Sequence, residues 1–140
     1  MELWIIYALL SAAFAALVAI FGKIGIQNID STLATTVRAI VMAFFLVSVS
    51  LMLGKAKLLS TIDNKTFMFI VLSGIAGALS WLFYFVALRS GPAGAVASLD
   101  RLSVVFVVLL AALFLGESLT WKTGIGVTLI TAGALFMTLK

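Results

Sequence analysis

The amino-acid sequence predicts an all-α integral membrane protein in which five transmembrane helices form one compact bundle. The first observation is composition, because 64% of the 140 residues are hydrophobic and only 10% are charged, whereas a soluble domain carries about 25% charged residues. The second is that five apolar stretches of about 20 residues, the length needed to cross a bilayer, follow one another along the chain. So short a chain cannot bury this much apolar surface within itself, so lipid is expected to solvate it.

The first two spans are expected at residues 3–22 and 32–53. The first ends at the glycine-rich segment Gly22-Lys23-Ile24-Gly25. Asp30 and Ser31 offer an N-cap for the second, and Gly54 ends it. A polar loop is expected to follow, containing Lys55, Lys57, Asp63, Asn64 and Lys65.

The remaining spans are expected at residues 66–89, 92–115 and 121–139. Before the fourth span, Gly91 suits the left-handed position past a helix end, and Pro92 suits the first turn of the next helix. Gly116 ends the fourth span and Thr120 can cap the fifth. Because no linker, low-complexity segment or internal repeat divides the chain, residues 1–140 are expected to form a single transmembrane domain.

The charges that flank the spans show almost no preference for one orientation. With five spans, the face of the N-terminus collects Lys55, Lys57, Lys65 and Lys122. The opposite face collects Lys23, Arg89 and Lys140, and also Arg38 if that side chain extends toward the membrane edge. Two explanations remain open: the cluster at residues 55–65 fixes the N-terminus in the cytoplasm, or the chain inserts in both orientations.

Several function classes are disfavoured by what the chain lacks. It has no cysteine and no histidine, so no metal site or cofactor is expected, and a membrane enzyme would have little catalytic machinery. The basic residues stand singly between apolar runs rather than in a stripe, so no nucleic acid is expected as a partner. The expected partners are the lipid bilayer and a small solute.

Ionisable side chains inside a span are costly, so they are the first candidates for function. Asp100 and Arg101 lie close to the middle of the fourth span. Adjacent helical residues point about 100° apart, so their partners are expected on other helices. One interpretation is a structural ion pair, for example between Asp100 and Arg38; the other, which we favour, is a solute or proton site facing a wet cavity.

One face of the third span combines small, polar and aromatic residues. Gly77, Ser80, Trp81 and Tyr84 follow the spacing i, i+3, i+4 and i+7, which places them on one side of a helix. Such a stripe is often plain packing. Trp81, however, lies well inside the span rather than at its edge, so a cavity lining is an equal alternative.

A series of short motifs recurs in a familiar order. They are Ala87-Leu88-Arg89-Ser90-Gly91-Pro92-Ala93, Ala97-Ser98-Leu99, Phe114-Leu115-Gly116-Glu117-Ser118-Leu119-Thr120, and the glycines Gly124, Gly126 and Gly133. Together with Thr36-Val37-Arg38-Ala39, they resemble the EamA domain of the drug/metabolite transporter superfamily over essentially the whole chain. Many members have a proline in the fourth helix where this chain reads Leu102-Ser103-Val104-Val105, so the usual kink is expected to be absent. Most members resemble two inverted five-helix halves in tandem, and this chain matches one half.

The resemblance implies a transporter in the plasma (inner) membrane that moves a small organic solute by alternating access. It implies a homodimer, with the antiparallel arrangement favoured, because transporter sites commonly lie between inverted repeats. The candidate residues for binding solute or protons, pairing charges and lining the cavity are Asp100, Arg101, Arg38, Trp81, Tyr84, Ser80 and Ser103. The alternative is an accessory or lipid-handling subunit that needs a different partner chain.

Overall fold

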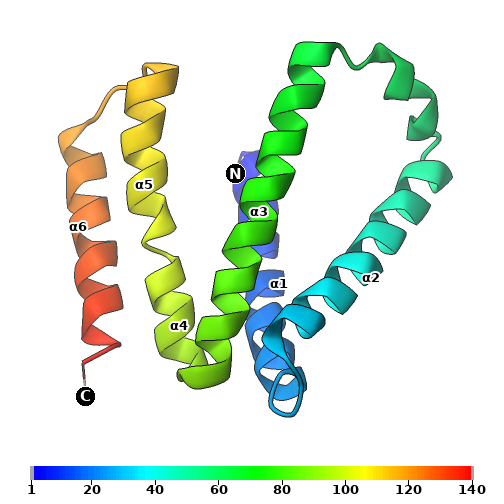
Figure 1. Cartoon of the computed structure of the whole chain (residues 1–140). Helices are drawn as coiled ribbons and strands as arrows, with labels where there is room; N and C mark the ends of the chain where they lie inside the picture. Colours follow the sequence, from blue (N-terminus) through cyan, green and yellow to red (C-terminus); the bar gives the residue numbers. More distant parts are fainter. Residues whose placement is uncertain (1, 140) are drawn as a thin grey trace. The chain divides into compact units, whose positions relative to one another are not determined.

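The computed structural model describes residues 2–139, and every regular element among them is a helix (Figure 1). Met1 and Lys140, the latter one of the flanking charges counted above, lie outside the described residues. The predicted all-α class is confirmed. The chain divides into two compact units: Gly22–Arg89 forms the first, and the segments before and after it form the second.

The helices in the first half of the chain begin and end close to the expected residues. They are α1 (Leu3–Gly25), α2 (Ser31–Met52), the 3₁₀ helix η1 (Lys55–Thr61) and α3 (Asn64–Ser90). The Asp30 carboxylate accepts hydrogen bonds from the backbone N–H groups of Thr32 at 2.9 Å and Leu33 at 3.1 Å, which confirms the predicted N-cap. These bonds, that from Leu33 above all, hold the pKa of Asp30 below its usual value. Gly54 adopts a left-handed φ of 67° and ends α2 as predicted.

The segment after Gly54 differs from the expected polar loop. Most of it winds into η1, and α3 begins at Asn64, two residues before the expected start. The Asp63 carboxylate explains this earlier start, because it accepts hydrogen bonds from the backbone N–H groups of Lys65 at 3.2 Å and Thr66 at 3.3 Å. Asp63 is therefore the N-cap of α3 as well as a charged residue of the preceding loop.

The buried part of the first unit lies where α1 and α3 end. Ile26 is 1% exposed, Phe85 3% and Leu88 0%. The Lys23 ammonium donates hydrogen bonds to the main-chain carbonyl oxygens of Leu88 at 2.6 Å and Arg89 at 3.4 Å. These carbonyls belong to the last turn of α3, where backbone acceptors lack partners within the helix. Lys23 therefore joins the end of α1 to the end of α3.

Gly22 lets these two helix ends approach closely. A Cβ atom added there would lie 3.2 Å from Cζ of Phe85 and 3.3 Å from Cδ2 of Leu88. Both neighbours are buried and have little room to move. We therefore expect Gly22→Leu to overpack this contact at a cost of about 1–3 kcal/mol. Thermal unfolding in detergent measures the effect, and Gly74→Leu is the control, because a Cβ at Gly74 meets nothing within 4 Å. An equal loss of stability in both variants would contradict this account.

The other unit contains the remaining helices, which are α4 (Ala93–Asp100), α5 (Ser103–Leu110), the π-helix η2 (Ala111–Leu115) and α6 (Trp121–Phe136). Gly116 follows η2 with a left-handed φ of 68°, as predicted. Thr120 caps α6 by accepting a hydrogen bond from the Thr123 backbone N–H at 3.2 Å, also as predicted. Gly91 is not among the glycines with positive φ in the described chain, so its expected left-handed conformation is wrong. The following Pro92 favours an extended conformation at Gly91. Pro92 itself is the N-cap of α4, one residue before the helix begins, and not part of the first turn as expected.

The fourth predicted span is interrupted by a turn at Arg101 and Leu102, here called the fourth-span break, which separates α4 from α5 (Figure 1). At the break, hydrogen bonds between residues three apart predominate, while bonds between residues four apart persist from Arg101 to Ala97 at 3.3 Å and from Phe106 to Leu102 at 3.4 Å. The N–H of Leu102 donates to the carbonyl of Leu99 at 3.0 Å, and the N–H of Val105 donates to that of Leu102 at 2.9 Å. The expectation that the proline-associated kink is absent stays a prediction; what the structure adds is a local 3₁₀ turn between α4 and α5, with Arg101 and Leu102 still in right-handed helical conformation.

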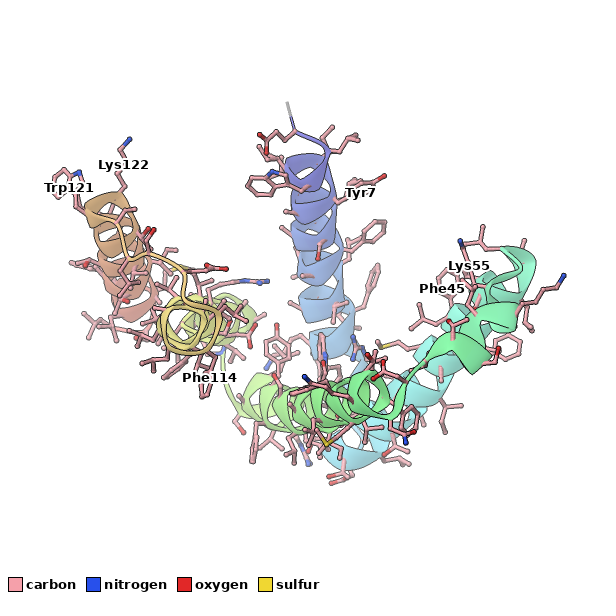
Figure 2. All side chains as sticks on the ribbon, turned by 90° about the horizontal axis from the view of Figure 1, so that it is seen from above. Tyr7, Phe45, Lys55, Phe114, Trp121 and Lys122 are labelled. Atoms are coloured by element: carbon pink, nitrogen blue, oxygen red, sulfur yellow. The ribbon has the colours of Figure 1, made fainter. Side chains whose placement is uncertain are left out.

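Four segments of the described chain are long and apolar enough to cross a membrane: α1, α2, α3 and Ala93–Leu115. At 16 residues, α6 is shorter than the roughly 20 residues that a span usually needs. The expected fifth crossing thus stays a prediction. Figure 2 shows apolar side chains projecting outward around the helices, including Tyr7 on α1, Phe45 on α2 and Phe114 in η2. Exposed apolar surface of this extent is favourable in lipid and costly in water.

Candidate functional site

The first unit brings a charged side chain of α2 onto the aromatic face of α3. Arg38 is seven residues past the start of α2, which corresponds to about 10 Å along the helix axis. Its guanidinium carbon lies 3.6 Å from the centroid of the Trp81 ring and 5.6 Å from that of Phe85. Arg38 and Trp81 are both half-buried. Two residues that the sequence predicts as separate candidates are therefore in direct contact.

The aromatic residues around Arg38 hold one another in place. The Trp81 and Tyr84 rings pack edge to face, with centroids 5.5 Å apart and planes inclined at 75°. Phe85 lies 6.0 Å from Trp81 and 6.2 Å from Tyr84 between ring centroids. Such tilted arrangements suit the charge distribution of aromatic rings. We refer to Arg38, Trp81, Tyr84 and Phe85 as the Arg38–aromatic cluster.

The charge of Arg38 is only partly compensated by these rings. An arginine costs about 2.5–3.5 kcal/mol at the centre of a span, and the cost falls toward the membrane edge. A cation over an aromatic face returns about 0.5–1 kcal/mol when exposed and about 2 kcal/mol when desolvated, and Arg38 is half-buried. Among the described residues, no hydrogen bond or ion pair is formed by the guanidinium of Arg38. Its N–H groups therefore remain available for an acceptor from outside this unit.

Two hydroxyl residues extend the polar face of α2 that carries Arg38. Ser31, Thr35 and Arg38 follow the spacing i, i+4 and i+7, which places them on one side of the helix. Ser31 and Thr35 are each 7% exposed, and the Thr35 hydroxyl donates to the Ser31 carbonyl oxygen at 2.8 Å. Ser31 and Thr35 are not among the candidates predicted from the sequence. The spacing of two hydroxyl residues and an arginine on an otherwise apolar helix is the signal from which this shared polar face could have been predicted.

The remaining members of the predicted set gather at the fourth-span break, in the other unit. Asp100 is the last residue of α4, Arg101 lies in the turn and Ser103 is the first residue of α5. All three are exposed, and within the described chain Asp100 and Arg101 form no ion pair with each other. Ser80 is also exposed, on the α3 side of the first unit. The predicted pairing of Asp100 with Arg38 joins residues of two different units and stays a prediction.

The geometry provides no assembled catalytic centre among the described residues. No group of three or more acidic residues there could hold a metal ion. What the described chain offers is a cation held on aromatic rings and, separately, a carboxylate, a guanidinium and a hydroxyl at a helix break. Both arrangements suit reversible binding of a polar group within a membrane.

Comparisons with known proteins agree with a membrane role. The model of the EamA-like transporter family matches residues 2–139. A relative from Sinorhizobium sp., named "Uncharacterized transporter in cobO 3'region", is 45% identical over 134 residues, which cover 96% of this chain and 95% of the relative. No solved structure matches the chain.

Proposed function

The chain belongs to the EamA-like transporter family, and we propose that it moves a small organic solute across the membrane by alternating access as an antiparallel homodimer. The family and the relative named as a transporter support the coarser conclusion of a multi-pass membrane transporter, and they favour a transporter over an enzyme. We place it in the plasma (inner) membrane. The proposal includes five spans, with α6 completing the set within one domain of residues 1–140.

The fourth-span break is the observation that carries this proposal. Transporters commonly build their sites from discontinuous helices near the middle of the membrane, where freed backbone groups and polar side chains meet the solute. Asp100, Arg101 and Ser103 occupy such a discontinuity within the apolar segment Ala93–Leu115. In our proposal Asp100 binds the solute or a proton and Arg101 balances its charge. Trp81, Tyr84 and Ser80 line the solute path.

The homodimer is supported by the size of the relative that is named as a transporter. Residues 2–139 match one EamA-like domain, whereas alternating access in many transporters depends on two inverted repeats. The alignment of 134 residues covers 95% of that relative, so the relative has the size of a single repeat. An odd number of spans lets a second copy, inserted the other way round, supply the inverted half.

Transport by the reconstituted chain is the direct test. We expect purified protein in lipid vesicles to take up at least one class of labelled metabolite faster than protein-free vesicles. The screen should cover organic acids, amino acids, sugars, nucleosides and amines. We also expect the purified chain to elute in detergent as a dimer without any other protein. Elution only together with a different protein, with no uptake of any class, would instead favour an accessory or lipid-handling subunit.

A further inference from the structure

We propose that Arg38, held against the face of Trp81, binds an oxyanion of the transported ligand, a carboxylate or a phosphate group. The inference rests on the proposed transport function and adds the chemical class of the ligand. It starts from the cation–π contact, in which the guanidinium carbon lies 3.6 Å from the Trp81 centroid.

The contact with Trp81 does not use the hydrogen-bond donors of the guanidinium, and no hydrogen bond or ion pair of this group occurs among the described residues. A guanidinium presents its N–H donors in its own plane, and an aromatic ring that stacks on it covers a flat face. That planar fork matches the two oxygens of a carboxylate or phosphate. The rings restrict the side chain before any ligand arrives, so less conformational freedom is lost on binding.

The composition of the first unit indicates the sign of the ligand's charge. Its acidic residues are Asp30 and Asp63, and both carboxylates already accept backbone hydrogen bonds as helix caps. Within Gly22–Arg89, Lys23, Lys65 and Arg89 lie one or two residues from the ends of their helices, whereas Arg38 is the charged residue farthest from a helix end, about 10 Å from the start of α2. A cation at this depth without a carboxylate from its own unit favours an anionic ligand over a neutral or cationic one.

Two sources can supply the same chemistry. The oxyanion can belong to a soluble solute that enters the transport path or to the headgroup of an anionic lipid. Two experiments distinguish these sources. In one, soluble anions are added to the protein in a neutral bilayer; in the other, the bilayer contains an anionic lipid and no soluble ligand is added.

The fluorescence of Trp81 is a suitable readout, because the indole contacts the proposed ligand-binding group. The chain has three tryptophans, so Trp4→Phe with Trp121→Phe leaves Trp81 as the single one. This protein is placed in nanodiscs of phosphatidylcholine and titrated with succinate, inorganic phosphate and, as the neutral counterpart, succinamide, at constant ionic strength. A second set of nanodiscs contains phosphatidylglycerol and no added solute.

We expect saturable fluorescence changes with succinate or phosphate and none with succinamide. Arg38→Gln should abolish the change, and Arg38→Lys should weaken the apparent affinity at least about tenfold, because an ammonium cannot form the planar fork. Arg89→Gln, which removes an exposed arginine of the same unit, should leave the titration unchanged. A change that depends on Arg38 and appears only with phosphatidylglycerol supports the anion site with a lipid as its ligand. No Arg38-dependent change with any of these anions would overturn the inference.

Binding in nanodiscs does not require transport, so the two hypotheses can fail separately. Anion binding by a chain that transports nothing in vesicles would contradict the proposed function and leave the Arg38 site standing. Transport of neutral or cationic solutes only, without anion binding, would contradict the Arg38 site and leave the proposed function standing.

Discussion

Asp100→Asn should reduce solute uptake by reconstituted vesicles to the level of protein-free vesicles, while the protein still inserts and elutes as the wild type does. The substitution keeps the size of the side chain and removes its charge and its ability to carry a proton. Asp100 is the acidic residue that lies within an apolar span at the fourth-span break, so we expect no other side chain to replace it. Uptake of the solute identified by the vesicle screen measures the effect.

Asp63→Asn is the matched control for this variant. It makes the same chemical change at a carboxylate that caps α3, and asparagine is also a good N-cap. Its transport should therefore equal that of the wild type. Full transport by a well-folded Asp100→Asn protein would show that this carboxylate binds neither solute nor proton. If Asp100→Asn failed to fold, a structural ion pair would be the better interpretation.

The second large effect is expected from charges added at the chain ends. Two or three lysines added after Lys140 should trap one orientation in the membrane, and the same number added near Glu2 should trap the other, because positive charges beside a span stay on the cytoplasmic side. If the working form is an antiparallel dimer, each variant alone should lose transport. Their co-expression should restore it. The flanking charges are nearly balanced, four against three when Arg38 is left out, so we expect this small addition to be sufficient.

The orientation itself can be measured directly. The chain contains no cysteine, so one cysteine introduced beside Lys140 is a unique labelling site. Membrane-impermeant maleimide should label this site from both sides of the membrane in the otherwise unchanged protein and from one side in each lysine variant. Labelling from one side only in the unchanged protein would rule out insertion in both orientations, and a parallel or heteromeric assembly would take its place.

The features that could be predicted from the sequence are those determined by a few neighbouring residues. Asp30 and Thr120 act as helix caps and Gly54 and Gly116 end helices as expected, because each effect depends on local backbone geometry. The fourth-span break was not predictable in this way. Proline is the recognisable cause of a kink, whereas the change to 3₁₀ bonding at Arg101 and Leu102 has no comparable sequence signal.

For the candidate site, the sequence could identify residues but not their contacts. Arg38 and Trp81 are conspicuous because polar and aromatic groups inside spans are costly or need partners. Their stacking depends on how α2 and α3 are rotated relative to each other within the first unit. Helical periodicity determines which residues share a face and leaves open which faces meet. For the same reason Gly22 could be recognised as part of a helix end but not as the point of closest approach to Phe85 and Leu88.

The fourth-span break also affects how the protein fits bilayers of different thickness. The segment Ala93–Leu115 has 23 residues, so as a continuous helix it would be about 34 Å long, a few ångströms more than a typical hydrocarbon core. A rigid rod of this length has to tilt as a whole when the bilayer is thin. A 3₁₀ stretch within a helix often marks a hinge, and with such a hinge between α4 and α5 each half could take up part of the tilt by itself. Thinner membranes can then be accommodated by bending at this hinge, without rotating the entire span against its neighbours.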